Sequence, residues 1–137
     1  MAASFVKNIG SAAANMATSA TITVPAGGIA QGDLIVVRVN FEGNNQVSVS
    51  DDGGNTYTRR VDRLTPPDYV SVFTAIATSA LSASDDITLS FSKDSGSIVI
   101  DQFTGLGDFD AVTTDTGSSA TPTVSDTPAG VGLVMGM

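Results

Sequence analysis

The sequence predicts an all-β protein, an antiparallel β-sandwich of Ig-like or jelly-roll type with about eight or nine strands and no substantial helix. Three observations lead to this prediction. The run 32–41 is rich in β-branched residues that alternate between two faces. Turn-forming residues, among them 14 glycines, separate short apolar runs along the whole chain. Strong helix formers are scarce, because Glu42 is the one glutamate and leucines are few.

The run 32–41 is expected to form the central strand. At period two, one face of it carries Ile35, Val37, Val39 and Phe41. The other face is apolar at Leu34 and Val36 and becomes polar at Arg38 and Asn40. A strand that is apolar on both faces lies inside a sandwich, so this one should be buried at its start and one-sided towards its end.

The N-terminal stretch 1–20 is less regular. A short strand is expected around Phe5 and Val6, and the alanine-rich stretch 10–17 is compatible with one helical turn or a flexible arm. We therefore divide the chain into an N-terminal arm or edge strand at residues 1–20 and a single β-sandwich domain at residues 21–137. That domain opens with a strand at 21–24, which Pro25 ends.

The remaining strands follow from alternation bounded by turn residues. A strand at 46–50 should reverse through Asp51–Asn55 into a hairpin with 56–61. Further strands are expected at 69–78, 87–92 and 97–103, with a turn at 93–96, an edge strand and linker at 111–126, and an apolar strand at 130–137. An apolar last strand would insert into its own sheet, add to the sheet of a neighbouring subunit, or belong to a longer protein.

Composition excludes several kinds of chemistry. The chain has no cysteine and no histidine, which removes disulfides, thiolate metal sites and the commonest general base. Its net charge of −8 disfavours binding to nucleic acid. No apolar stretch has the length of a membrane span or of a signal peptide. We expect no enzyme, no catalytic residues, no cofactor and no metal.

Acidic residues are the main candidates for a site. Asp51–Asn55 could hold Ca²⁺, together with Asp108 and Asp110, but a glycine-rich turn explains the same residues and is favoured. The adjacent pairs Asp51–Asp52 and Asp85–Asp86 suit glycoside hydrolysis poorly, because neighbours on a strand point to opposite faces.

Two further hypotheses concern the basic residues. Lys7 or Lys93 could form a covalent staple with an Asn or Asp side chain beside Glu42, although a solvated turn glutamate is the simpler interpretation. Four arginines gather in one region of the sequence, where they form either a docking patch for an acidic neighbour or ordinary solvated partners of aspartates; they are Arg38, Arg59, Arg60 and Arg63.

Three segments together resemble a family of β-sandwich modules found in phage structural proteins (head decoration and fibre proteins) and in bacterial surface proteins. They are 21–27, 32–37 and 47–58. The stretch 129–134 resembles the family's returning strand, which would lie beside Leu34–Val39. Family members often carry a tryptophan and this chain has none, which speaks against a carbohydrate-stacking role.

This resemblance implies a structural, non-catalytic virion protein, in particular a phage capsid decoration or cement protein that acts through protein–protein contacts. Its partners would be other structural subunits, with neither nucleic acid nor membrane, and it would form a homo-oligomer such as a trimer. The alternative is an extracellular adhesion or glycan-binding module of a longer surface protein.

Overall fold

The computed structural model describes residues 4–42, 46–65 and 68–105. These residues form six strands: β1 (Ser4–Thr23), β2 (Leu34–Glu42), β3 (Ser48–Asp51), β4 (Thr58–Thr65), β5 (Asp68–Ile76) and β6 (Asp86–Thr104). All strand pairs are antiparallel, and the described residues contain no helix. The all-β prediction is confirmed.

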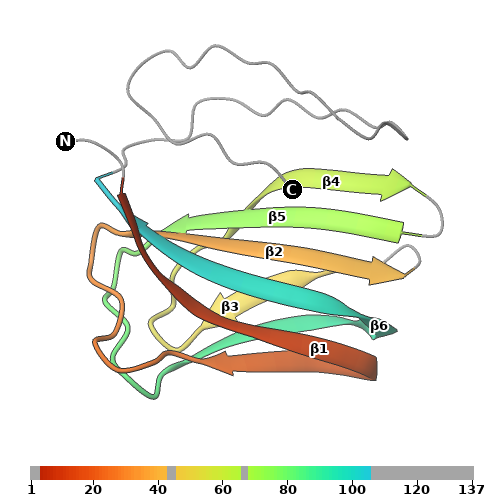
Figure 1. Ribbon diagram of the computed structural model, residues 1–137, viewed down its shortest axis with the longest axis horizontal. Coiled ribbons are helices and arrows are strands. Elements are labelled where there is room, and N and C mark those ends of the chain that lie inside the picture. Colours follow the sequence, from red (N-terminus) through yellow and green to blue (C-terminus); the bar gives the residue numbers. More distant parts are fainter. Residues whose placement is uncertain (1–3, 43–45, 66–67, 106–137) are drawn as a thin grey trace, which may run out of the picture.

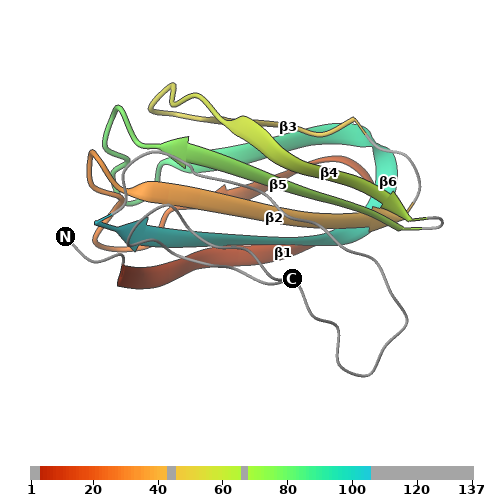
Figure 2. The same ribbon diagram turned by 90° about the horizontal axis from the view of Figure 1, so that it is seen from above.

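The six strands form one curled sheet (Figure 1). Its order is β1-β6-β2-β5-β4, and β3 pairs with the first half of β6. The second half of β6 pairs with β2, and β1 follows β6 along both halves. Figure 2 shows β6 turning at one end of the molecule from one side of the curl to the other. The two halves of the sheet are thus joined through β1 and β6.

The inner surface of the curl holds the main core. Its largest fully buried side chains come from both halves of the sheet, and Ile35, Val37, Val39 and Phe41 of β2 are at most 1% exposed. At about 25 cal/mol per Å² of apolar surface, this inner face supplies the main drive for curling. The curl also brings distant parts of one strand together, because a Cβ added at Gly10 would meet Ile22 Cγ2 at 2.7 Å.

The prediction for the central strand is confirmed. β2 pairs with β5 along its whole length and with β6 from Leu34 to Phe41. Its outer face is also apolar at the start, where Val36 joins a second, smaller cluster with Val72 and Phe103. Because both edges of β2 are occupied, the place beside Leu34–Val39 that the family resemblance implied for 129–134 is already taken. The segments 111–126 and 129–137 themselves lie outside the described residues.

Within the described residues the number of strands is lower than expected, because two long strands each replace two short ones. β1 spans both strands predicted before Pro25 and the alanine-rich stretch between them, so neither alternative given for that stretch, a helical turn or a flexible arm, is found. Its alanines fit a strand because Ala12, Ala17 and Ala20 pack against the core, where the two halves of the sheet approach closely. Tertiary packing overrides their helix propensity. β1 stands at one end of the strand order, and it continues past the expected boundary at 20 to Thr23.

The predicted turn at 93–96 is also wrong, because β6 runs through it. Gly96 lies directly opposite Phe41, and a Cβ at this position would stand 2.8 Å from the Cα of Phe41 and would overlap the backbone oxygen of Asn40. The glycine is therefore required for close approach of two strands and does not reverse the chain.

The hairpin expected between 46–50 and 56–61 does not form. Asp51–Gly54 is a turn, with a hydrogen bond of 3.1 Å from Gly54 N to Asp51 O, but β3 pairs with β6 and β4 pairs with β5. The turn carries the chain from one half of the curled sheet to the other.

Candidate interaction surface

In the part of the chain that the structure describes, three strands have an edge without a neighbouring strand. Within the described residues, β1, β3 and β4 each pair with a single neighbour. The unpaired N–H and C=O groups of such an edge can accept another strand, so proteins usually block their edges. The three edges differ in how they are blocked.

The edge at β4 is blocked by charge. This strand includes Arg59, Arg60, Asp62 and Arg63, and a bulge lies between Arg59 and Val61. Charged side chains and bulges are the ordinary means of keeping an edge unpaired. The edge at β3 is only four residues long.

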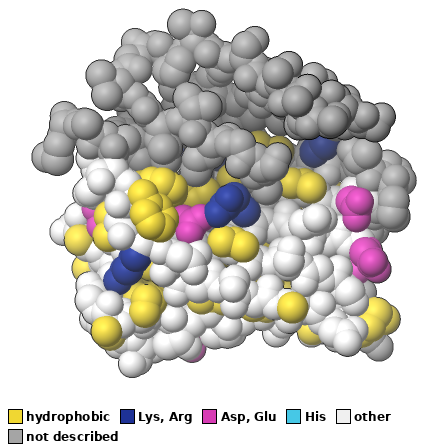
Figure 3. Space-filling model, in the orientation of Figure 1, with side chains coloured by type: hydrophobic (Ala, Val, Ile, Leu, Met, Phe, Trp, Pro, Cys, Tyr) yellow, Lys and Arg dark blue, Asp and Glu magenta, His cyan; other side chains and the backbone are white. Residues whose placement is uncertain are grey.

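The edge at β1 is protected neither by charge nor by proline, and its bulges leave regular stretches between them. It extends over 20 residues, with no proline and one charged residue, Lys7. The Lys7 ammonium donates to the carbonyl of Ala26 at 3.2 Å, so it points to a loop. Figure 3 shows mostly uncharged side chains and backbone on the visible face along β1. Register shifts interrupt the pairing with β6 at four places, which leaves Gly10–Ala14 and Ser19–Thr23 as its regular stretches.

Exposed apolar side chains mark the same strand. Within the described part of the chain, the exposed large hydrophobic side chains are Phe5 at 57%, Val6 at 43%, Met16 at 58% and Ile76 at 38%. Three of these four belong to β1. Scattered apolar residues are normal on a surface, but their concentration along one unblocked edge indicates a contact surface. The sequence carried one sign of this surface, the single charge in the stretch 1–23.

The four arginines do not form one patch. Arg59 lies on the core side of β4, with its guanidinium carbon 5.1 Å from the centre of the Phe73 ring, and donates to the carbonyl of Val47 at 2.5 Å. Arg38 is on β2, where it forms an ion pair with Asp101. Arg60 donates to the Thr74 hydroxyl at 2.8 Å. The docking-patch hypothesis is therefore wrong for Arg59, and it stays a prediction for the other three arginines.

Arg59 instead connects separate parts of the sheet. It forms an ion pair of 3.2 Å with Asp62 and contacts the Tyr69 hydroxyl, which in turn donates to Asp62. Its bond to Val47 reaches the residue before β3. This network holds β4 against the start of β3 across the curl.

The acidic turn is occupied by its own hydrogen bonds. The Asp51 carboxylate accepts from Asn55 N and Asn55 Nδ2, both at 3.0 Å, and from the Tyr57 hydroxyl at 2.8 Å. Burial, followed by the bond to Asp51, raises the pKa of Tyr57 far above its usual value. Asp52 accepts from the backbone N–H of Asp86. Among the described residues no group of three or more acidic side chains is arranged to hold a metal ion, and Asp108 and Asp110 lie outside them.

Asn55 is the centre of this turn. It is 6% exposed, and its side chain makes four hydrogen bonds. The amide nitrogen donates to Asp51 Oδ2 and to the carbonyl of Ser79, while the amide oxygen accepts from Ser79 N and the Thr78 hydroxyl. All of the side chain's hydrogen-bonding capacity is used, which makes it a structural plug between two loops.

The other candidate residues are placed as follows. The carboxylates of Asp85 and Asp86 accept from Ser82 N and the Thr23 hydroxyl, both at 2.7 Å. Lys7 lies beside Gln102, whose partner on β2 is Ile35, and Glu42 is at the far end of that strand, about 23 Å away at a rise of about 3.3 Å per residue. A staple from Lys7 to an Asn or Asp side chain beside Glu42 is therefore wrong. The Lys93 side chain lies outside what the structure describes.

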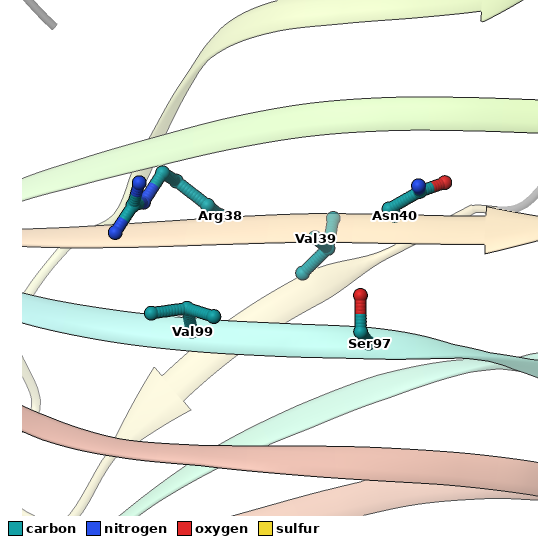
Figure 4. A pocket seen from close by; sticks show the side chains of 5 residues that line it. All are labelled: Arg38, Val39, Asn40, Ser97 and Val99. Carbon is teal, nitrogen blue, oxygen red and sulfur yellow. The ribbon is translucent and has the colours of Figure 1, made fainter. Parts of the chain in front are cut away.

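One hollow lies on the outer face between β2 and β6. It has a volume of about 150 Å³ and is lined by Arg38, Val39, Asn40, Ser97 and Val99 (Figure 4). Asp101, which is 7% exposed, neutralises Arg38 and also accepts from Asn8 Nδ2 at 2.8 Å. A hollow of this size is below the roughly 300–1,000 Å³ of ordinary ligand pockets. The edge of β1 remains the better candidate.

Comparisons with protein-family models, with curated proteins and with solved structures found no match. Within the described ranges, no helix is long and apolar enough to cross a membrane.

Proposed function

We propose that the protein is a structural, non-catalytic virion component, a phage capsid decoration or cement protein that works through protein–protein contacts along the free edge of β1. The observation that carries this proposal is the contrast between edges. β1 is long and nearly uncharged, whereas β4 is charged and β3 is short. An Ig-like or jelly-roll sandwich, the usual form of such modules, is part of the proposal.

The chemistry of the described residues supports this function. The acidic groups that could have served catalysis accept hydrogen bonds from their own turns, as Asp51 does from Asn55 and Tyr57. Strand addition at an edge gives affinity through main-chain hydrogen bonds and needs no reactive group. On a symmetric particle such contacts repeat many times, so each can be weak while the assembly is strong.

The proposal predicts that a coat protein is encoded next to this gene, and that coat protein provides the test. Particles assembled from it are mixed with the protein and imaged by electron cryomicroscopy. We expect ordered copies of the protein on the particle surface. The Ala13→Lys variant, which places a charge on the edge, should bind poorly, whereas the control Ala83→Lys, at an exposed position outside the strands, should bind as the wild type does.

Two other results would contradict the decoration function. Tandem β-modules in one long reading frame around this sequence, together with glycan binding by the isolated protein, would establish the extracellular adhesion module instead. If this gene lies beside a coat-protein gene and particles of that coat protein bind none of this protein, the decoration function is refuted.

A further inference from the structure

We infer that the free edge of β1 binds the β1 edge of a second copy of this chain, in an antiparallel, two-fold pair centred on Ala12. This inference rests on the proposed use of this edge as a contact surface, and it names the partner as a neighbouring copy, so that Ala13→Lys weakens decoration by removing contacts between copies. The pair would join the curled sheets of two copies into one.

The regular part of the edge determines the centre. Between two register shifts, Gly10–Ala14 pairs without interruption with Ile100–Gly96 of β6. In an antiparallel ladder alternate residues direct both N–H and C=O away from their partner, so this stretch presents free groups at a regular spacing. A two-fold axis through Ala12 sets Gly10 opposite Ala14 of the second copy and maps the regular stretch onto itself.

The faces also agree in this register. Gly10, Ala12 and Ala14 face the core, as shown by the contact at Gly10 with Ile22 and the packing of the two alanines. Ser11 and Ala13 are exposed on the opposite face. Residues directly opposite in an antiparallel pair share a face, so the axis pairs core-facing residues with each other and Ser11 with Ala13. The side chains of this stretch are all small, and none obstructs the approach of a second strand.

Charge favours a copy of the same chain at this place. The chain carries a net charge of −8, so two copies repel each other over most of their surfaces. Along β1 no acidic residue is present, and the single cation, Lys7, would face the uncharged segment near Ala17 of the second copy. β1 is thus a stretch along which two copies can meet without like charges opposite one another.

The exposed apolar side chains lie where the pair would cover them. Antiparallel pairing about Ala12 sets Met16 opposite Asn8 of the second copy, from where its long side chain can reach diagonally to the exposed Val6, two positions along the strand. Both copies make this contact, since the interface is isologous. A ladder as short as Gly10–Ala14 buries less than the roughly 800 Å² per partner of a standard interface, so we expect a weak dimer whose population depends on concentration.

The test is sedimentation velocity of the full chain over about two decades of concentration. We expect a monomer–dimer equilibrium in the wild type, a dissociation constant at least about tenfold higher in Ala13→Lys, and no change in Ala83→Lys. A tenfold weakening corresponds to about 1.4 kcal/mol. In this register each new lysine faces Ser11 of the second copy and lies diagonally from the second copy's lysine, so the two like charges repel across the pair.

A crosslinking measurement tests the proposed register. Because the chain has no cysteine, Ala12→Cys introduces a single thiol on the two-fold axis, and Ala83→Cys provides the matched control. Under an added oxidant such as oxidised glutathione, two thiols form one disulfide while the oxidant is reduced to two thiols. The Ala12→Cys dimer should form much faster than the Ala83→Cys dimer. Circular dichroism of each variant checks that the fold is kept.

The outcomes separate this inference from the proposed function. A wild type that stays monomeric, or an Ala12→Cys variant that crosslinks no faster than Ala83→Cys, overturns the inference. If such a monomer still decorates particles, the proposed function stands while the inference falls. A dimer sensitive to Ala13→Lys supports the inference even where no particle is decorated.

Discussion

Replacing Asn55 by alanine should destabilise the protein strongly, although the residue lies in a loop. The substitution removes four hydrogen bonds, to Asp51, to the carbonyl and N–H of Ser79, and to Thr78. At a net value of about 1 kcal/mol per bond the loss would reach about 4 kcal/mol. Thr78 and Ser79 are exposed, so water can replace part of it. We expect a fall of about 2–4 kcal/mol in the free energy of unfolding.

The assay is urea denaturation followed by tyrosine fluorescence, since the chain has no tryptophan and Tyr57 belongs to the same network. Asn15→Ala serves as the control, because Asn15 is exposed on β1, and it should change stability by less than about 0.5 kcal/mol. Asn55→Asp sharpens the test. A carboxylate in this place cannot donate, and it would set an oxygen against Asp51 Oδ2, so it should cost at least as much as alanine at neutral pH. If Asn55→Ala unfolds at the same urea concentration as Asn15→Ala, the plug described above does not stabilise the fold.

Three further predictions concern single contacts. Because burial raises the pKa of Tyr57, the folded protein holds its phenol neutral. The stability that this gives is present below the pKa of about 10 that the tyrosine has in the unfolded chain, and it is lost as pH rises above that value. Between about pH 8 and 11, the free energy of unfolding should therefore fall less in Tyr57→Phe than in the wild type. Gly96→Ala should lower the free energy of unfolding by more than about 3 kcal/mol, since its Cβ would overlap the backbone of β2. The control Gly32→Ala meets nothing within 4 Å and should cost about 1–2 kcal/mol through its positive φ alone. Equal losses of stability for the two variants in thermal or urea unfolding would contradict the close approach at Gly96. Arg59→Lys loses the forked guanidinium that bridges β4 to the start of β3, so its free energy of unfolding should fall by about 1.5–3 kcal/mol in the same assay. A change below about 0.5 kcal/mol would contradict this bridging role.

Local alternation predicted the strands that carry most of the core. The run 34–42 showed its two faces clearly because each position contributes one side chain to one face, and β2 occupies the centre of the sheet as expected. In the same way, Tyr69, Phe73 and Ala75 of β5 alternate into the core.

Long strands were harder to predict because their irregularities look like ends. Met16, with a positive φ of 50°, lies within the register shift between Ala14 and Ala17, where alternation is interrupted without ending the strand. Gly96 resembled a turn residue, but its role depends on Phe41, which belongs to a different strand far away in the sequence. Pairing partners of this kind are set by the whole sheet and leave no local signature.

The candidate surface was only partly predictable for the same reason. The low charge of the stretch 1–23 is visible in the sequence. That this stretch forms an edge depends on β6 pairing with β2 on its other side, which is a property of the order of strands. The turn at Asp51–Asn55 was correctly favoured as a turn, but its link to Ser79 required the fold.

The pairing of β1 with β6, the first and last of the described strands, has a consequence for synthesis of the chain. Ser4 pairs with Thr104 and Thr23 with Asp86, so β1 leaves the ribosome long before its partner is translated. During that interval a long, nearly neutral segment has no ladder on either side and is available to other nascent chains. Closure of the fold also depends on contacts between residues far apart in sequence, which form slowly. The protein should therefore fold mainly after translation has passed β6, and its yield in cells should depend on how well this early segment is protected.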